Sequence, residues 1–271
     1  MTVDTANLRR VVGASAAAVG VLQTATAVVA LRRGRRDYAD GVWGPGLAAV
    51  ALTSAAVGTG DPWRRWALAA ATTAWATRLE TLMLKRLRGS DEEDERYTEF
   101  LEGDGTPTVV AKVFGTQAVA QLLVSAPVQL AAASALPRGR RKWLFPLGIG
   151  VMVAGGVVEA LADRQKSRFM AEKKKAKDEG REAPEVLDTG LWGLSRHPNY
   201  FGDSLVWDGA WLAAAASAPA GWTLPAPVAM SYFLVYATGA KRTEDRMEDR
   251  PAYRDYQDRV SFFVPLPKGL G

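Results

Sequence analysis

Residues 11–31 read VVGASAAAVGVLQTATAVVAL, a run without a charged residue. A transmembrane helix needs about 20 mostly apolar residues to cross about 30 Å of hydrocarbon. The run is longer than the apolar core of a cleavable signal peptide, which has about 7–15 residues. The arginine-rich residues 32–36 follow it, as in a stop-transfer sequence. We therefore predict that this segment spans a membrane.

Further segments have the length and apolar composition of membrane spans. They are residues 41–60, 63–84, 113–136, 143–158, 204–218 and 222–240. Backbone polar groups in lipid must bond internally, and these runs lack the two-residue alternation of a membrane barrel. The predicted fold is therefore all-α, a polytopic membrane bundle of about seven transmembrane helices.

The distribution of Lys and Arg predicts the orientation. Basic clusters follow the first, third, fifth and seventh predicted spans, at residues 32–36, 85–88, 164–177 and 241–246. Because basic loops stay on the cytoplasmic side, this favours an N-terminus outside and a C-terminus in the cytoplasm. A cluster at residues 138–142, between the fourth and fifth spans, disagrees.

The composition narrows the possible chemistry. The 271 residues contain no cysteine and a single histidine, His197. This excludes disulfides and cysteine nucleophiles and leaves too few ligands for a structural zinc site, so we expect no metal. Basic loops facing anionic headgroups explain the net charge of +5, so membrane lipids, and no nucleic acid, are the expected partners. No motif specifies an oligomeric state.

The chain divides into two predicted parts. Residues 1–108 hold the first three spans and a charged cytoplasmic loop at residues 91–96. Residues 109–271 hold the last four spans, the cofactor-binding loops described below and a cytoplasmic tail.

Two carboxylates, Glu159 and Asp163, lie just after the fifth predicted span, in a continuation of its helix. A charge at the centre of a span costs roughly 2.5–3.5 kcal/mol, and residues four apart share one face of a helix. The pair could bind ribose hydroxyls or amide groups of a nucleotide, or could be a structural pair with Arg164 or another arginine. Both interpretations stay open. Helix capping explains Asp203 but not Asp208, which lies deeper in the sixth span.

Residues 195–203, SRHPNYFGD, are the densest group of functional side chains. Arg196 suits a phosphate as a bidentate donor, and the helix N-terminus that follows also favours anions. Tyr200 and Phe201 can stack on a planar ring. His197 precedes a proline in an extended turn, and a lone histidine is more often structural than catalytic. An interfacial aromatic belt explains some of these residues, but not the Asn, His and Asp together.

Residues 191–203, LWGLSRHPNYFGD, followed by Trp207, resemble the signature of the steroid 5α-reductase superfamily, and most closely its bacterial branch, a domain of unknown function. The likeness continues over most of the chain. It includes residues 40–44, 93–97, 159–169 and 250–257. The Arg-His-Pro core is less specific to one reaction, because isoprenylcysteine and phospholipid methyltransferases share it.

The resemblance implies a helical membrane bundle whose cytoplasmic C-terminal half binds NADPH. It implies reduction of a carbon–carbon double bond in a lipid or sterol-like substrate, by a multi-pass protein of a bacterial inner (plasma) membrane. Carried over position by position, the cofactor-binding residues are Glu159, Asp163, Arg196, His197, Asn199, Tyr200, Asp203, Trp207, Lys241 and Tyr256. Asp203 stands where the family more often has Glu.

The catalytic residues depart from the family pattern. The animal steroid enzymes pair a membrane Glu with a Tyr to polarise the substrate ketone. The first two predicted spans contain no Glu. Glu80 and Tyr97 are the nearest candidates for a catalytic pair, and each also has a structural interpretation.

Two other functions stay open. An S-adenosylmethionine-dependent lipid or isoprenylcysteine-type methyltransferase would share the Arg-His-Pro core. However, Glu244-Asp245 comes one position earlier after Arg242 than the glutamate pair of such enzymes, and it ends in Asp. A non-enzymatic lipid-binding or scaffold protein is the third possibility, and the presence of Glu159 and Asn199 argues against it.

Overall fold

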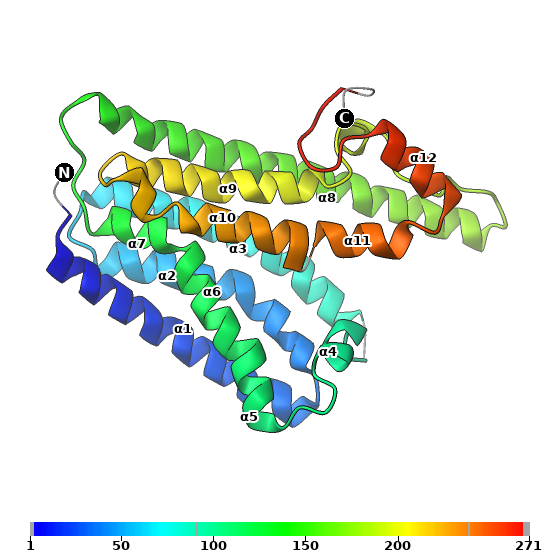
Figure 1. The fold of residues 1–271 in the computed structure, drawn as a ribbon, viewed down its shortest axis with the longest axis horizontal. Coiled ribbons are helices and arrows are strands. Elements are labelled where there is room, and N and C mark those ends of the chain that lie inside the picture. Colours follow the sequence, from blue (N-terminus) through cyan, green and yellow to red (C-terminus); the bar gives the residue numbers. More distant parts are fainter. Residues whose placement is uncertain (1–2, 90–91, 238, 268–271) are drawn as a thin grey trace. The chain divides into compact units, whose positions relative to one another are not determined.

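The computed structural model describes residues 3–89, 92–237 and 239–267 (Figure 1). Within these ranges it consists of helices and loops, with one isolated antiparallel bridge between Val3 and Ser134 and no strand. The all-α fold is thereby confirmed for these residues. Asp91 of the predicted charged loop and the end of the tail, residues 268–271, lie outside the described residues.

The helices follow one another through the whole chain. The α-helices are α1 Thr5–Arg33, α2 Trp43–Val57, α3 Pro62–Arg88, α4 Glu95–Phe100, α5 Thr106–Val109, α6 Thr116–Val124, α7 Ala126–Ala132, α8 Leu144–Asp178, α9 Pro198–Ala215, α10 Pro225–Tyr232, α11 Ala240–Met247 and α12 Pro251–Arg259. Shorter 3₁₀ and π turns are η1 Arg36–Val42, η2 Val110–Gly115, η3 Arg140–Trp143, η4 Gly190–Gly193, η5 Ala220–Trp222 and η6 Phe233–Ala237.

Three helical stretches are long and apolar enough to cross a membrane, judged by length and composition. They are Thr5–Arg33, Thr106–Val124 and Arg140–Asp178. They correspond to the first, fourth and fifth predicted spans and mark the chain as a membrane protein. At the other predicted spans, α2 has 15 residues, α9 has 18 and α10 has 8, whereas α3 has 27 residues but is not among the stretches apolar enough to cross a membrane. The number of seven spans therefore stays a prediction.

The ends of α1 follow from local sequence. Asp4 is the N-cap, and its side chain accepts a hydrogen bond from the backbone N–H of Asn7 at 2.9 Å. The helix ends at Arg33, and the following cap residue Gly34 has a φ of 66°, which suits glycine because it has no Cβ. Arg32 and Arg33 in the last turn are favourable at the negative end of the helix dipole.

The apolar run predicted as one span over residues 113–136 is divided. A π turn, η2, precedes α6, and Ser125 separates α6 from α7. Pro127 has no N–H for an intrahelical bond and its ring crowds the preceding turn, so a continuous helix is interrupted here. The hydroxyl of Ser125 donates to the backbone carbonyl of Gln121 at 2.5 Å.

Met1–Ile149 and Ala210–Ala229 form the first of two compact units. Within it α2 packs against both α1 and α3. The approach of α2 to α3 requires a small residue, because a Cβ on Gly44 would lie 2.9 Å from the carbonyl oxygen of Ala76. The glycine thus permits close packing of the two helices.

A buried glutamine cluster joins helices of the first unit. Nε2 of Gln23 on α1 donates to Oε1 of Gln117 at 3.0 Å and of Gln121 at 3.1 Å, both on α6. Nε2 of Gln121 donates to the carbonyl of Val42, where η1 ends, at 2.9 Å. Polar side chains inside an apolar bundle are tolerated when they bond one another in this way.

Arg64 near the start of α3 connects two helix ends. Its side chain is fully buried, and Nη1 donates to the carbonyls of Ala131 at 3.2 Å and Ser134 at 3.0 Å, at the end of α7. Nη2 donates to the carbonyl of Ala213 at 3.2 Å and to the hydroxyl of Ser217 at 2.6 Å, at the end of α9. The last carbonyls of a helix have no internal partner, so this arginine caps both helices.

Arg141 also caps α9. Its guanidinium donates to the carbonyl of Ala215 at 2.6 Å and to that of Ala218. Part of the basic cluster at residues 138–142 is thus explained by helix capping.

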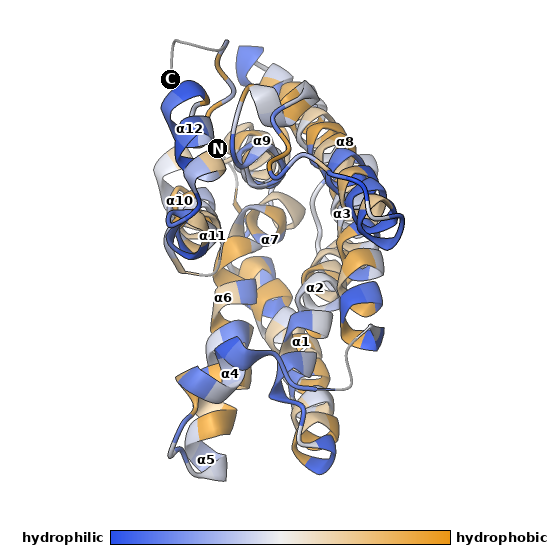
Figure 2. Ribbon diagram, turned by 90° about the vertical axis from the view of Figure 1, so that its right-hand side faces the viewer, coloured by the Kyte–Doolittle hydropathy of each residue, from blue (hydrophilic) through white to orange (hydrophobic). Residues whose placement is uncertain are grey.

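Gly150–Gly209 and Met230–Gly271 form the second unit. Its helices α8 and α9 approach closely, since a Cβ on Gly202 would lie 2.7 Å from the carbonyl oxygen of Gly155. At about 1.5 Å per residue, the 35 residues of α8 make it longer than the ~30 Å of hydrocarbon that a membrane span must cross. Figure 2 shows α12 as strongly hydrophilic, as expected of a helix outside the membrane.

Each compact unit is built from two separate segments of the chain. The division at residue 108 predicted from sequence stays a prediction.

Candidate functional site

The Arg-His-Pro motif leads into α9, which begins at Pro198. Proline suits the first helical position because its missing N–H would have no intrahelical partner there. The hydroxyl of Ser195 donates to the carbonyl of Phe263 at 2.8 Å, and the N–H of Arg196 donates to that of Ser261 at 2.9 Å. The C-terminal segment therefore holds the motif in place.

Glu244 on α11 is the centre of a buried polar network. Its Oε1 and Oε2 accept hydrogen bonds from Nε and Nη2 of Arg196 at 3.1 and 2.9 Å. Nε2 of His197 lies 2.9 Å from Oε1, and the hydroxyl of Tyr253 donates to the same oxygen at 2.7 Å. Gln257 donates to Oε2 at 2.8 Å. One carboxylate thus joins the motif, α11 and α12.

The electrostatics of this network favour an ionised carboxylate. Burial alone would raise the pKa of Glu244, but the hydrogen bonds from His197, Arg196, Tyr253 and Gln257 outweigh burial and hold that pKa well below its usual range. Burial and the hydrogen bond to Glu244 raise the pKa of Tyr253, so its phenol keeps the proton that it donates.

Arg196 has further internal partners. Its Nη1 donates to the backbone carbonyls of Gln257 at 2.9 Å and Val260 at 2.6 Å. With Nε and Nη2 bonded to Glu244, every nitrogen of the guanidinium contacts the protein. Its contact with a phosphate stays a prediction.

A cavity of about 300 Å³ lies beside this network. The cations Lys166, Lys173 and Arg250 line it, together with aromatic side chains that include Trp192 and Phe169. Lys166 and Lys173 are seven residues apart on α8 and so share one face of the helix. Nζ of Lys166 lies 5.7 Å from the centre of the Trp192 ring.

Half of the predicted cofactor-binding residues line this cavity. They are Arg196, His197, Asn199, Tyr200 and Tyr256. The hydroxyl of Tyr256 donates to the carbonyl of Trp192 at 2.6 Å, which fixes α12 against η4.

The other predicted residues lie away from the cavity wall. Asp163 accepts a hydrogen bond from Nδ2 of Asn199 at 3.3 Å, so it supports a lining residue. Glu159 on α8 is buried, and so are Asp203 and Trp207 on α9. Asp203 lies inside α9, so it does not cap that helix as expected. Lys241 is exposed on α11. The cofactor-binding roles of all of these residues stay predictions.

Sequence reasoning did not select several residues that the structure places here. Lys166 and Lys173 were included only in the basic cluster at residues 164–177, although their spacing of seven was a signal that they share a face. Glu244 was considered only for the methyltransferase alternative. Its buried role carries no local sequence signal, because its partner Arg196 is 48 residues away.

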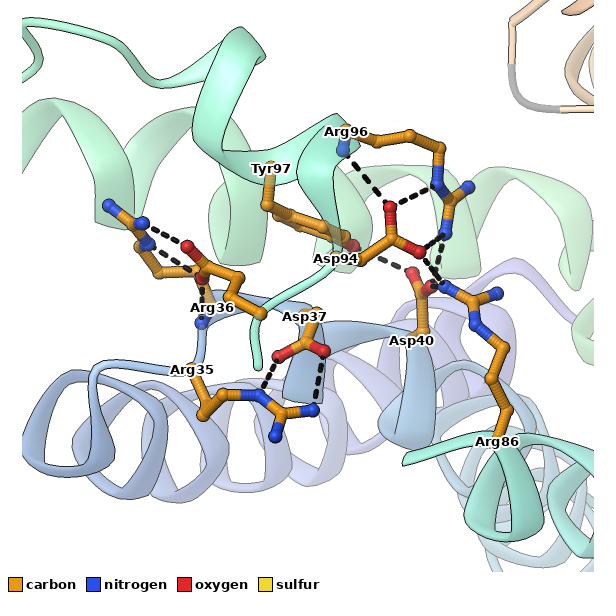
Figure 3. Close-up of polar contacts among 9 residues, drawn as sticks. Arg35, Arg36, Asp37, Asp40, Arg86, Asp94, Arg96 and Tyr97 are labelled. Atoms are coloured by element: carbon orange, nitrogen blue, oxygen red, sulfur yellow. Dashed lines mark hydrogen bonds and ion pairs between the residues drawn. The ribbon is translucent and has the colours of Figure 1, made fainter. Parts of the chain in front are cut away.

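The predicted catalytic Tyr97 lies in a network of the first unit (Figure 3). Its hydroxyl donates to Oδ1 of Asp40 at 2.6 Å. Nη2 of Arg86 and Nη2 of Arg96 each lie 3.0 Å from Oδ2 of Asp40. The same two arginines contact Asp94. These contacts hold α4 and the loop before it against η1 and the end of α3.

Asp94 and Tyr97 have pKa values shifted away from neutral pH. The hydrogen bond from Arg96 lowers the pKa of Asp94 to about 2. Burial, and then the charge of Asp40, raise the pKa of Tyr97, so its phenol stays protonated. The hydroxyl group of Tyr97 is already hydrogen-bonded to the carboxylate of Asp40.

Glu80 lies near the same segment. Its Oε1 would be 3.6 Å from a Cβ placed on Gly41, next to the residue that Tyr97 contacts. The structure thus places both catalytic candidates beside η1, in the first unit, whereas the cofactor candidates belong to the second unit. The catalytic roles of Glu80 and Tyr97 stay predictions.

Comparison with known proteins gives a family. Residues 27–260 match the sequence model of DUF1295, described as a protein of unknown function. An uncharacterized protein of Schizosaccharomyces pombe is 35% identical over 85 residues, which cover 30% of this chain and 24% of that protein. The chain thus matches about a quarter of that relative's length. No solved structure matches.

Proposed function

The chain belongs to the DUF1295 family, and we propose that it is a membrane-embedded NADPH-dependent reductase of a carbon–carbon double bond in a lipid or sterol-like substrate. The observation that carries this proposal is the cavity in the second unit, where cations, aromatic rings and the Arg-His-Pro-Asn-Tyr motif come together. The membrane helices favour a lipid substrate, because such a molecule reaches the protein from the bilayer.

The lining residues fit a dinucleotide in three respects. Lys166, Lys173 and Arg250 supply positive charge for phosphate groups. Aromatic side chains supply surfaces on which planar rings stack. Asn199 supplies a buried Oδ1 that has no hydrogen-bond partner among the described residues, because its Nδ2 is directed at Asp163. This orphaned acceptor suits an N–H or O–H donor of a ligand.

Within this proposal the protein's residues bind and orient the nucleotide. Bound NADPH supplies a hydride to one carbon of the double bond, and a proton added to the other carbon completes the reduction. Glu80 and Tyr97 are the proposed acids. Because the hydroxyl of Tyr97 already donates a hydrogen bond to Asp40, Glu80 is the better candidate for proton transfer to the substrate.

The S-adenosylmethionine-dependent methyltransferase is the alternative activity. It rested on the shared motif and on Glu244-Asp245. In the structure Glu244 is buried and bonded to Arg196, His197, Tyr253 and Gln257. No observation in the cavity favours this alternative, so we keep it as an outcome of the binding experiment.

NADPH is expected to raise the thermal stability of the purified protein more than NADH or S-adenosylmethionine does. A ligand at a hundredfold excess over its Kd stabilises the folded state by about 2.7 kcal/mol. Replacing Lys166 and Lys173 together by glutamine should weaken NADPH binding roughly tenfold or more, because charged hydrogen bonds to phosphate are lost.

The matched control is the double replacement of Lys174 and Lys177, exposed lysines of the same helix that do not line the cavity. It should bind NADPH like the wild type. Equal losses in both double variants would show non-specific charge attraction and count against the pocket. A shift with S-adenosylmethionine alone would transfer the proposal to the methyltransferase.

We also propose that the chain crosses a bacterial inner (plasma) membrane seven times, with its N-terminus outside. Segments predicted on the outer side meet within the first unit. The N–H of Asp4 donates to the carbonyl of Ala133, and that of Thr59 donates to Oδ1 of Asn7. Arg64 contacts Ser217, so the end of the sixth predicted span also belongs to this group of segments. These contacts support the alternation of the spans.

Single cysteines provide the test, because the chain has none of its own. Thr59→Cys is expected to react with a membrane-impermeant maleimide in intact bacterial cells. Thr98→Cys, on α4 just after the predicted cytoplasmic loop, should react only after lysis. Both positions are exposed on the protein surface. The reverse pattern would invert the proposed orientation, and equal labelling of both in intact cells would contradict the alternation.

A further inference from the structure

One ring nitrogen of His197, Nε2, already has a hydrogen-bond partner within the protein. Its ring lies 5.8 Å from the ring of Tyr200 at an interplanar angle of 14°, and 5.4 Å from Phe262 in an edge-to-face arrangement. Its Nε2 is bonded to Glu244. No hydrogen bond to Nδ1 is made by the residues that the structure describes. The imidazole nevertheless lines the cavity.

The partner of Nε2 decides the tautomer. An ionised carboxylate only accepts hydrogen bonds, and Glu244 already accepts them from Arg196 and Tyr253. Nε2 of His197 must therefore carry the proton and donate it. In a neutral imidazole the opposite nitrogen is then an acceptor. Glu244 thus fixes Nδ1 as a hydrogen-bond acceptor on a residue of the cavity wall.

We infer that His197 accepts a hydrogen bond at Nδ1 from an NH2 group, an amino or a carboxamide group, carried by a planar ring of the nucleotide, with Glu244 as the positioning residue that sets its tautomer. This inference rests on the proposed nucleotide-binding function. The aromatic side chains around the imidazole favour a planar group with the donor on its edge, rather than a sugar hydroxyl. NADPH offers this chemistry twice, as the amino group of adenine and as the carboxamide of nicotinamide.

Two replacements of His197 distinguish the role of Nδ1 from that of Nε2. In His197→Gln the longer side chain brings its amide towards the position of Nε2, so the contact with Glu244 is kept and the acceptor is lost. In His197→Asn the shorter side chain brings its amide towards the position of Nδ1, so an acceptor is kept and the contact with Glu244 is lost. If His197 had only a structural role, His197→Gln, which keeps the contact with Glu244, would resemble the wild type more closely than His197→Asn in every assay.

The experiment measures the binding of NADPH and two analogues to the full-length protein in detergent. In one analogue hypoxanthine replaces adenine, and in the other a carboxylate replaces the carboxamide. All measurements are made at the same pH. The wild type is expected to bind one analogue about three- to tenfold more weakly than NADPH, which corresponds to one lost hydrogen bond. The analogue affected identifies the ring.

The variants complete the test. His197→Gln should lose the discrimination between NADPH and that analogue, and His197→Asn should retain it. If the wild type binds NADPH but discriminates against neither analogue, or if His197→Gln discriminates as the wild type does, the inference is overturned while the proposed function stands. If the wild type does not bind NADPH, the proposed function fails and takes this inference with it.

Discussion

Glu244→Ala is expected to lower the free energy of unfolding of the second unit by about 3–5 kcal/mol. The replacement removes the acceptor of Arg196, His197, Tyr253 and Gln257 at once. It leaves a buried guanidinium without its counter-ion, and this cost is much larger than that of an exposed ion pair. We expect α11 and α12 to separate from the motif.

Limited trypsin digestion measures this effect, because the backbone next to the basic residues of α11 becomes accessible to the protease when the unit unfolds. Asp245→Ala is the matched control, since Asp245 is exposed on the same helix. It should resist trypsin as the wild type does. Equal resistance of Glu244→Ala would contradict the structural role.

The same site predicts a pH dependence. The pKa of Glu244 is lower in the folded protein than its ordinary value of 4.5. Its stabilising contribution is therefore complete above that value and is lost as the pH falls below it. Glu244→Gln, which cannot ionise, should lack this part of the acid sensitivity.

Local patterns were sufficient for α1 but not for the start of α9, because a helix over residues 204–218 capped by Asp203 was expected and α9 begins earlier, at Pro198. The uncharged run at residues 11–31 became part of α1, and the Arg-His-Pro motif leads into a helix that begins at its proline. Apolar composition acts on the nearest few residues, so it can be recognised from sequence.

The polar contacts between distant elements were not predictable in this way. Arg196 suits a phosphate by its chemistry, and nothing near it in sequence shows that Glu244 is its partner. The interruption at Ser125 was missed because the apolar composition continues through Pro127. Hydrophobicity records where a chain is apolar, whereas the path of its backbone depends on single residues.

Arg64 shows the same limitation in the first unit. From sequence it was a charged residue near the end of a predicted span, which membrane insertion tolerates. In the structure it is buried and bonded to the ends of α7 and α9. Replacing a buried ion pair by apolar residues is often neutral. That argument does not extend to Arg64, because its acceptors are mostly backbone carbonyls that no substitution removes.

Arg64→Met is therefore expected to destabilise the first unit by about 3–5 kcal/mol, since the carbonyls of Ala131, Ser134 and Ala213 lose their shared donor and each unsatisfied group costs about 1–3 kcal/mol. Methionine keeps most of the apolar stem, so the loss reports the hydrogen bonds rather than packing. The fraction of protein that stays monodisperse after heating in detergent measures the effect. Arg88→Met, at an exposed position in the last turn of the same helix, is the control and should behave as the wild type does. A heat resistance of Arg64→Met equal to that of Arg88→Met would mean that water or other donors satisfy these helix ends, and that the arginine is a membrane-boundary charge rather than a cap.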